Sequence, residues 1–327
     1  MTLSLFGAAV VPSLLILWYF RNRDLHPEPR SVVMRTFWYG VVITVPAALG
    51  EHFETRLFAL VSDASPLAAS LNSAFLCAAL IEELLKFWVL WSYASKTQAF
   101  DEPMDGIVYG VTASLGFATL ENILYVSQHG MGTAVVRAVM AVPGHAAWGA
   151  VMGYYVGQSR FGDPALRVNQ VFLGLAVPIV LHGLYDFPLM WVDKDAQAKG
   201  AFGWMLILPV AVVIGSWWFA VRQVRRLRAD QEGGRFAPVA VEDTTDNRVA
   251  RQPVGRTLVQ WVKIAIGGLL ATWGGLITLG IALGVAVGDN KAQDLTKLAI
   301  GTAIIGLLPL LAGAALFASG VRRPAAA

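Results

Sequence analysis

Hydrophobic residues fall along the chain in blocks of about 20, separated by shorter polar or charged segments. A helix of ~20 apolar residues crosses the ~30 Å hydrocarbon core of a bilayer. The pattern therefore predicts an all-α protein, a polytopic transmembrane helix bundle. The predicted spans, about nine in number, are residues 3–20, 32–50, 67–91, 106–127, 134–157, 170–192, 202–221, 258–287 and 298–318.

The composition supports a membrane protein and excludes a soluble globule. Of the 327 residues, 56% are hydrophobic and 14% are charged, against ~25% charged in soluble domains. The net charge of +3 does not indicate nucleic acid, because the basic residues lie at the ends of apolar blocks and form no patch with aromatic residues. The expected partner is the lipid bilayer.

The distribution of basic residues predicts the orientation of the spans. No Lys or Arg precedes the first block, whereas Arg21, Arg23 and Arg30 follow it. Since cytoplasmic loops carry the excess of Lys and Arg, the N-terminus is expected outside and the 21–31 loop in the cytoplasm. Nine spans then place the C-terminus in the cytoplasm. The first block is not expected to be a cleaved signal peptide.

One long polar segment divides the chain into three predicted parts. Residues 1–221 form a body of seven spans, and residues 258–327 form an extension of two spans. The segment 222–257 between them begins with several arginines and has few large apolar residues, so it is interpreted as a cytoplasmic linker that cannot build a core.

Ionisable residues inside the spans carry the functional information, because burying a charge in hydrocarbon costs ~2.5–3.5 kcal/mol on insertion scales. The third span contains Glu82, Glu83 and Lys86. Lys86 lies three and four residues after the two glutamates and reaches either of them across one helical turn. One glutamate is expected to pair with Lys86, and the other suits a general base. A Glu–Lys pair that only joins helices is the structural alternative.

Three further spans each contribute ionisable residues. Glu121 is the acid of the fourth span, followed by Asn122; His145 lies in the fifth; His182 and Asp186 lie one turn apart in the sixth. The depths of these residues along their spans allow one cluster of carboxylates and imidazoles. Two neutral imidazoles and a carboxylate would form a three-ligand site for a divalent metal, with another glutamate to take a proton from water. Peptide hydrolysis is the natural reaction. The motifs His-Glu-x-x-His and Gly-x-Ser-Gly are absent.

Four motifs follow in order on successive spans: Glu-Glu-x-x-Lys at 82–86, Phe-x-x-x-Glu-Asn at 117–122, His-x-x-x-Gly at 145–149 and His-x-x-x-Asp at 182–186. This series resembles the PrsW family of intramembrane proteases, which are related to the CAAX prenyl proteases. The resemblance covers roughly residues 10–195.

The resemblance implies a bacterial plasma-membrane or inner-membrane protease. Its substrates would be membrane proteins or peptides, including regulators of the anti-sigma type, and it would use a divalent metal, expected to be zinc. Carried over by motif, Glu82 and Glu83 would be the catalytic pair. The metal ligands would be Glu121, His145 and His182, and the supporting residues would be Lys86, Asn122 and Asp186.

Two other functions are alternatives to a protease. A proton-coupled transporter would employ the acids and histidines as a relay, although neither inverted repeats nor paired broken helices stand out in the sequence. A structural or receptor-like scaffold would leave the intramembrane acids unexplained.

Overall fold

The computed structural model describes residues 2–61, 65–194 and 203–235, together with the single positions 200, 311, 314 and 315. All regular structure in these ranges is helical. The predicted span 258–287, nearly all of the predicted span 298–318 and most of the predicted linker lie outside them.

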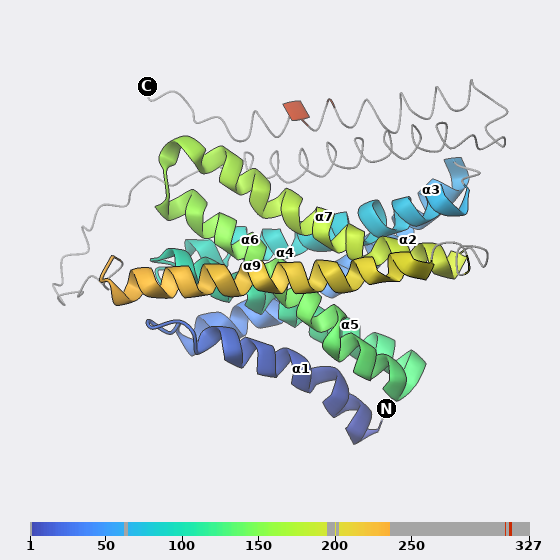
Figure 1. The fold of residues 1–327 in the computed structure, drawn as a ribbon, viewed down its shortest axis with the longest axis horizontal. Helices are drawn as coiled ribbons and strands as arrows, with labels where there is room; N and C mark the ends of the chain where they lie inside the picture. Colours follow the sequence, from blue (N-terminus) through green and yellow to red (C-terminus); the bar gives the residue numbers. More distant parts are fainter. Residues whose placement is uncertain are drawn as a thin grey trace.

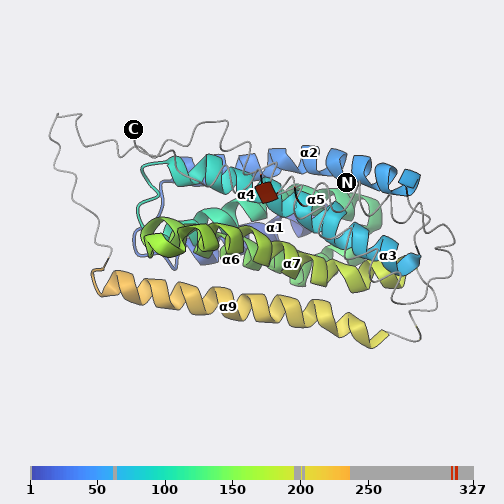
Figure 2. The same cartoon turned by 90° about the horizontal axis from the view of Figure 1, so that it is seen from above.

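The helices run side by side as a bundle (Figure 1), and α9 lies along one flank of it when seen from above (Figure 2). In chain order they are α1 (Leu3–Arg21), α2 (Arg30–Val61), α3 (Pro66–Leu71), the π-helix η1 (Asn72–Leu80), α4 (Ile81–Ser92), η2 (Ala94–Lys96), α5 (Pro103–Val139), α6 (Ala141–Phe161), η3 (Pro164–Leu166), α7 (Arg167–Lys194), η4 (Gly203–Leu206) and α9 (Ile207–Glu232).

By length and composition, five helical stretches of the described residues are able to cross a membrane: Leu3–Arg21, Arg30–Arg56, Pro103–Phe161, Pro164–Lys194 and Gly203–Glu232. The third of these is 59 residues long and contains both the fourth and the fifth predicted spans. The transmembrane helix bundle is therefore confirmed for this part of the chain. The total of nine spans and the orientation of the termini stay predictions.

The long stretch reverses direction at Gly130, where the backbone has φ 80° and ψ −162° inside α5. A positive φ is readily adopted only by glycine, so this residue permits the turn between the two predicted spans. After the turn the chain runs back antiparallel to the first part of α5, so that Gly110 of α5 lies against Gly149 of α6. A Cβ atom at either glycine would meet the other helix at under 3.0 Å. Gly149, the glycine of the motif at 145–149, therefore allows the two helices to pack closely.

The predicted span 67–91 is helical but is not one straight helix. It consists of α3, then a π-helix of nine residues, then α4. A π-helix has a wider turn than an α-helix and is frequent at functional sites. Glu82 and Glu83 lie in the first turn of α4, directly after it.

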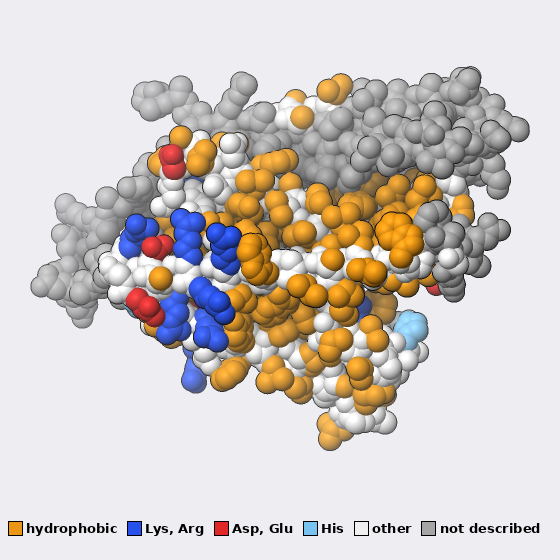
Figure 3. All heavy atoms as spheres, viewed as in Figure 1, with side chains coloured by type: hydrophobic (Ala, Val, Ile, Leu, Met, Phe, Trp, Pro, Cys, Tyr) orange, Lys and Arg blue, Asp and Glu red, His pale blue; other side chains and the backbone are white. Residues whose placement is uncertain are grey.

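Residues 222–232, predicted to begin the linker, are instead the last part of α9. Arg, Ala, Leu, Gln and Glu are good helix formers, and Arg228 pairs with Glu232 one turn later at 3.1 Å. The division into body, linker and extension stays a prediction. On the face shown in Figure 3, Lys and Arg side chains gather at one end and hydrophobic side chains cover most of the rest. Such a separation of basic and hydrophobic side chains is typical of the surface of a membrane-spanning protein.

Candidate active site

Ionisable side chains from four neighbouring helices meet inside the bundle. The helices α4, α5, α6 and α7 pack against one another and contribute, in that order, Glu82, Glu83 and Lys86, then Glu121, then His145, then His182. Glu83 and Lys86 are 0% exposed, and Glu82 is 5% exposed. The sequence predicted that these groups converge, and the structure brings them together.

Lys86 lies at the centre of the cluster. Its Nζ atom is 2.9 Å from Oε2 of Glu82, 2.8 Å from Oε1 of Glu83 and 3.0 Å from Nδ1 of His145. An ammonium group has three hydrogens to donate, and here it has three acceptors. The two adjacent glutamates therefore share the positive charge of Lys86, and this charge allows both to lie in the bundle interior.

His145 is held on both sides of its ring. Since Lys86 only donates, Nδ1 of His145 accepts, and Nε2 on the other side of the ring lies 2.9 Å from Oε2 of Glu121. The acceptor role of Nδ1 leaves the ring proton on Nε2 and so fixes one neutral tautomer of the imidazole.

Glu121 has a second partner that the sequence reasoning missed. Arg137, beyond the turn at Gly130, lies 2.9 Å from Glu121 and donates through Nε to Oδ1 of Asn122 at 2.9 Å. The Asn122 amide in turn donates to the carbonyl of Ala9 in α1 at 2.8 Å. Asn122 thus joins the two arms of α5, before and after Gly130, to α1. The signal that could have revealed Arg137 is its position inside a predicted apolar span.

His182 lies between two carboxylates. Its Nδ1 atom is 2.9 Å from Oε1 of Glu83, and its Nε2 atom is 3.1 Å from Oδ2 of Asp186. The predicted pairing of His182 with Asp186 across one helical turn is therefore present. The ring also stacks on Trp148, with centroids 4.4 Å apart, a contact that the sequence did not predict. The imidazole is held in place on three sides.

A metal fits the donor types of this cluster. Glu82, Glu83, His145 and His182 each offer one ligand atom, and these four atoms lie within 4.8 Å of one another. Glu121, which was predicted as a ligand, is outside this group and is paired with Arg137. The ammonium of Lys86 contacts three of the four residues, so a metal among them requires the lysine side chain to swing away. We refer to Glu82, Glu83, Lys86, His145 and His182 as the Glu–Lys–His cluster.

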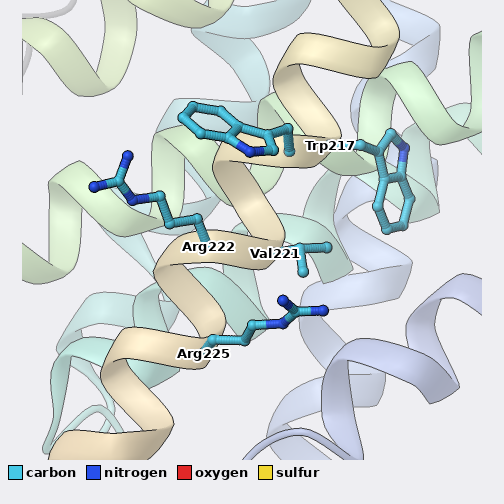
Figure 4. Close-up of a pocket in the computed structure, with 5 residues that line it drawn as sticks. Trp217, Val221, Arg222 and Arg225 are labelled. Atoms are coloured by element: carbon cyan, nitrogen blue, oxygen red, sulfur yellow. The ribbon is translucent and has the colours of Figure 1, made fainter.

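A surface hollow on α9 contains none of these residues. Its lining is Trp217, Trp218, Val221, Arg222 and Arg225 (Figure 4). The guanidinium of Arg222 lies 5.3 Å from the ring centre of Trp218. Trp and Arg together are typical of the level of lipid headgroups.

Comparisons with known proteins define the class of the protein. Residues 28–214 match the family described as PrsW family intramembrane metalloprotease. The chain is 38% identical over 239 residues to "Protease PrsW" of Geobacillus kaustophilus, covering 72% of this chain and 97% of that protein. It is 36% identical over 228 residues to "Protease PrsW" of Bacillus subtilis, covering 69% of this chain and 96% of that protein. No solved structure matches the chain significantly.

The helical membrane bundle and these relatives together define the class of the protein, a multi-pass intramembrane protease of the kind found in bacteria. The chain belongs to the PrsW family of intramembrane metalloproteases. The relatives give no support to the transporter alternative.

Proposed function

We propose that the protein cleaves peptide bonds of membrane-anchored substrates with a water molecule activated by Glu82. The Glu–Lys–His cluster carries this proposal. Of its two glutamates, Glu82 retains some exposure, 5% against 0% for Glu83. Oε1 of Glu83 is already bound by both Lys86 and His182. Glu82 is therefore the better general base, which takes the proton from the attacking water.

The other members position or stabilise charge. With Lys86 in the position described, Glu83 holds Lys86 and His182 and is a positioning residue. In that position the ammonium of Lys86 is a preorganised positive charge, and such a charge stabilises the oxyanion that forms when water attacks a carbonyl. The amide of Asn122, a predicted supporting residue, donates to the carbonyl of Ala9, which favours Lys86 over Asn122 for stabilising the oxyanion.

The metal-binding residues are proposed to be Glu83, His145 and His182, which leaves Glu82 free as the base. Glu83 replaces Glu121 in the predicted set because Arg137 already neutralises Glu121. One carboxylate and two imidazoles form a common catalytic zinc site with an open position. A bound zinc ion supplies Lewis-acid activation of water.

The proposed substrates are membrane proteins with a single span, among them regulators such as anti-sigma factors. His145 and His182 of the cluster lie on helices able to cross a bilayer, so a peptide bond must reach the cluster from within the membrane or near its surface. Single-span regulators present such a bond without unfolding a large domain.

The test of this function is cleavage in a membrane. Full-length protein is co-expressed in bacteria with epitope-tagged single-span anti-sigma factors, and cleavage is followed by immunoblotting. We expect a shorter membrane-bound fragment that is absent without the protein. The same fragment pattern in cells with and without it would contradict the proposal.

Metal removal gives a separate prediction. We expect purified protein to retain zinc, His182→Ala to lose it, and cleavage to fall after chelation and return on addition of zinc. Elemental analysis and the cleavage assay measure these changes. Full cleavage by protein from which all metal has been removed would contradict the metal assignment and leave the glutamate mechanism.

A further inference from the structure

A second group of carboxylates lies away from the Glu–Lys–His cluster, where two loops meet the end of α9. Asp24 and Glu28 belong to the α1–α2 loop, Glu102 precedes α5, and Asp105 lies in its first turn. All four residues are buried, with exposures from 0% to 4%. In Figure 1 the C-terminal end of α9 lies beside these loops.

Two of these carboxylates are each held by only one of their oxygens. Oδ1 of Asp24 accepts from Nε2 of Gln231 at 2.7 Å and from the backbone of His26 at 3.0 Å. Oδ2 of Asp105 accepts from two backbone N–H groups at 2.7 Å. The second oxygens, Oδ2 of Asp24 and Oδ1 of Asp105, are fully buried and accept no hydrogen bond from the described residues. A buried oxygen without a partner costs about 1–3 kcal/mol, so these two atoms indicate a missing ligand.

The positions of the oxygens suit a cation. Asp24, Glu102 and Asp105 each offer one oxygen, and the three atoms lie within 4.8 Å of one another. Ligand oxygens bound to one Ca²⁺ ion at 2.3–2.6 Å lie at most about 5 Å apart. The carboxyl group of Glu28 lies against Asp105, and its other contact is the hydroxyl of Tyr109, which donates to Oε2.

The charges of this group are poorly balanced by the protein itself. His26 pairs with the group, with Nδ1 3.3 Å from Glu102, and Arg160 interacts electrostatically with Asp105. Burial raises the pKa of Glu28 to about 7 and also raises the pKa of Asp24 and Glu102. Each of these acids is therefore costly to keep ionised without an added positive charge.

We propose that Asp24, Glu102 and Asp105, with Glu28 beside them, bind a divalent cation that prefers oxygen ligands, Ca²⁺ or Mg²⁺. The unpaired oxygens of Asp24 and Asp105 complete its coordination. Because Gln231 donates to both Asp24 and Glu102, the bound ion fixes the end of α9 against the two loops. This site differs in chemistry from the Glu–Lys–His cluster, since it has no histidine within its ligand group.

The test is the thermal stability of the purified full-length protein in detergent, with EDTA or with added Ca²⁺ or Mg²⁺. At about 100 times Kd we expect one of the two cations to raise the apparent melting temperature of the wild type by about 5 °C or more. The rise should persist in His182→Ala, which removes a proposed metal ligand of the Glu–Lys–His cluster and so places the rise outside that cluster. Asp24→Asn should abolish it, whereas the matched control Asp163→Asn, an exposed acid that caps η3, should keep it.

Isothermal titration of wild-type protein with each cation measures binding directly and does not depend on how well Asp24→Asn folds. Heat of binding in His182→Ala would support the site. No binding and no change in melting temperature with either cation would overturn the proposal, and shared protons would then account for the buried acids. An equal shift in Asp24→Asn would also overturn it.

Discussion

Replacing Glu82 with glutamine is expected to lower kcat for peptide cleavage by about 10²–10⁴-fold, because the amide cannot accept the proton of the attacking water. The change keeps the size of the side chain and its contact with Lys86 through the amide oxygen. KM should change little, since the substrate backbone is not bound by this group. Kinetics on purified protein in liposomes, with a tagged single-span substrate, measure both constants.

Glu54→Gln is the matched control for this experiment. Glu54 is a buried glutamate of the neighbouring α2, 8% exposed, and it accepts a hydrogen bond from Asn72 at 3.2 Å that a glutamine oxygen also accepts. Its kcat should stay near that of the wild type. A Glu82→Gln protein that cleaves as fast as Glu54→Gln would remove Glu82 from the mechanism.

Lys86→Met is expected to lower the free energy of unfolding by about 3–5 kcal/mol, because it leaves two buried glutamates without the positive charge that they share. Lys86 is 0% exposed and contacts both acids at under 3.0 Å. Unfolding in mixed detergent micelles, followed by tryptophan fluorescence, measures the difference in free energy of unfolding.

Two further variants give this prediction its controls. Lys194→Met removes an exposed lysine that donates to Ala69 and Ser73, and surface changes of this kind usually cost under about 1 kcal/mol. Adding Glu83→Gln to Lys86→Met should recover part of the loss, because one unpaired charge is removed. If Lys86→Met were as stable as Lys194→Met, the ammonium would not neutralise the two acids.

The part of the site that could be predicted from the sequence is the set of charged or ionisable residues inside apolar blocks, because burying a charge in hydrocarbon is costly. Glu82, Glu83, His145 and His182 stand out because each interrupts an apolar block, and a charge in such a block must face the bundle interior. Helical spacing alone puts Lys86 within reach of either glutamate, but the sequence predicted a pair with one of them, and Lys86 contacts both. These local rules identify the members of the cluster from the sequence.

Contacts between distant segments could not be found in this way. Glu121 was expected to need a partner from another helix, but nothing in the spacing selects Arg137 across a turn of the chain. The division of the third span by a π-helix also leaves no clear pattern, because its residues are as apolar as those of an α-helix. The carboxylates around Asp24 were missed since loop acids are ordinarily solvated, whereas here Gln231 of α9 contacts both Asp24 and Glu102.

The turn at Gly130 has a consequence for how the protein enters the bilayer. An isolated segment that carried Glu121 or Arg137 alone would bring an uncompensated charge into lipid. With the turn formed, the two side chains meet at 2.9 Å. The two antiparallel segments together are then the smallest part of the chain that enters the bilayer with these two charges paired. Membrane insertion of this region is therefore expected to proceed as a helical hairpin rather than one helix at a time.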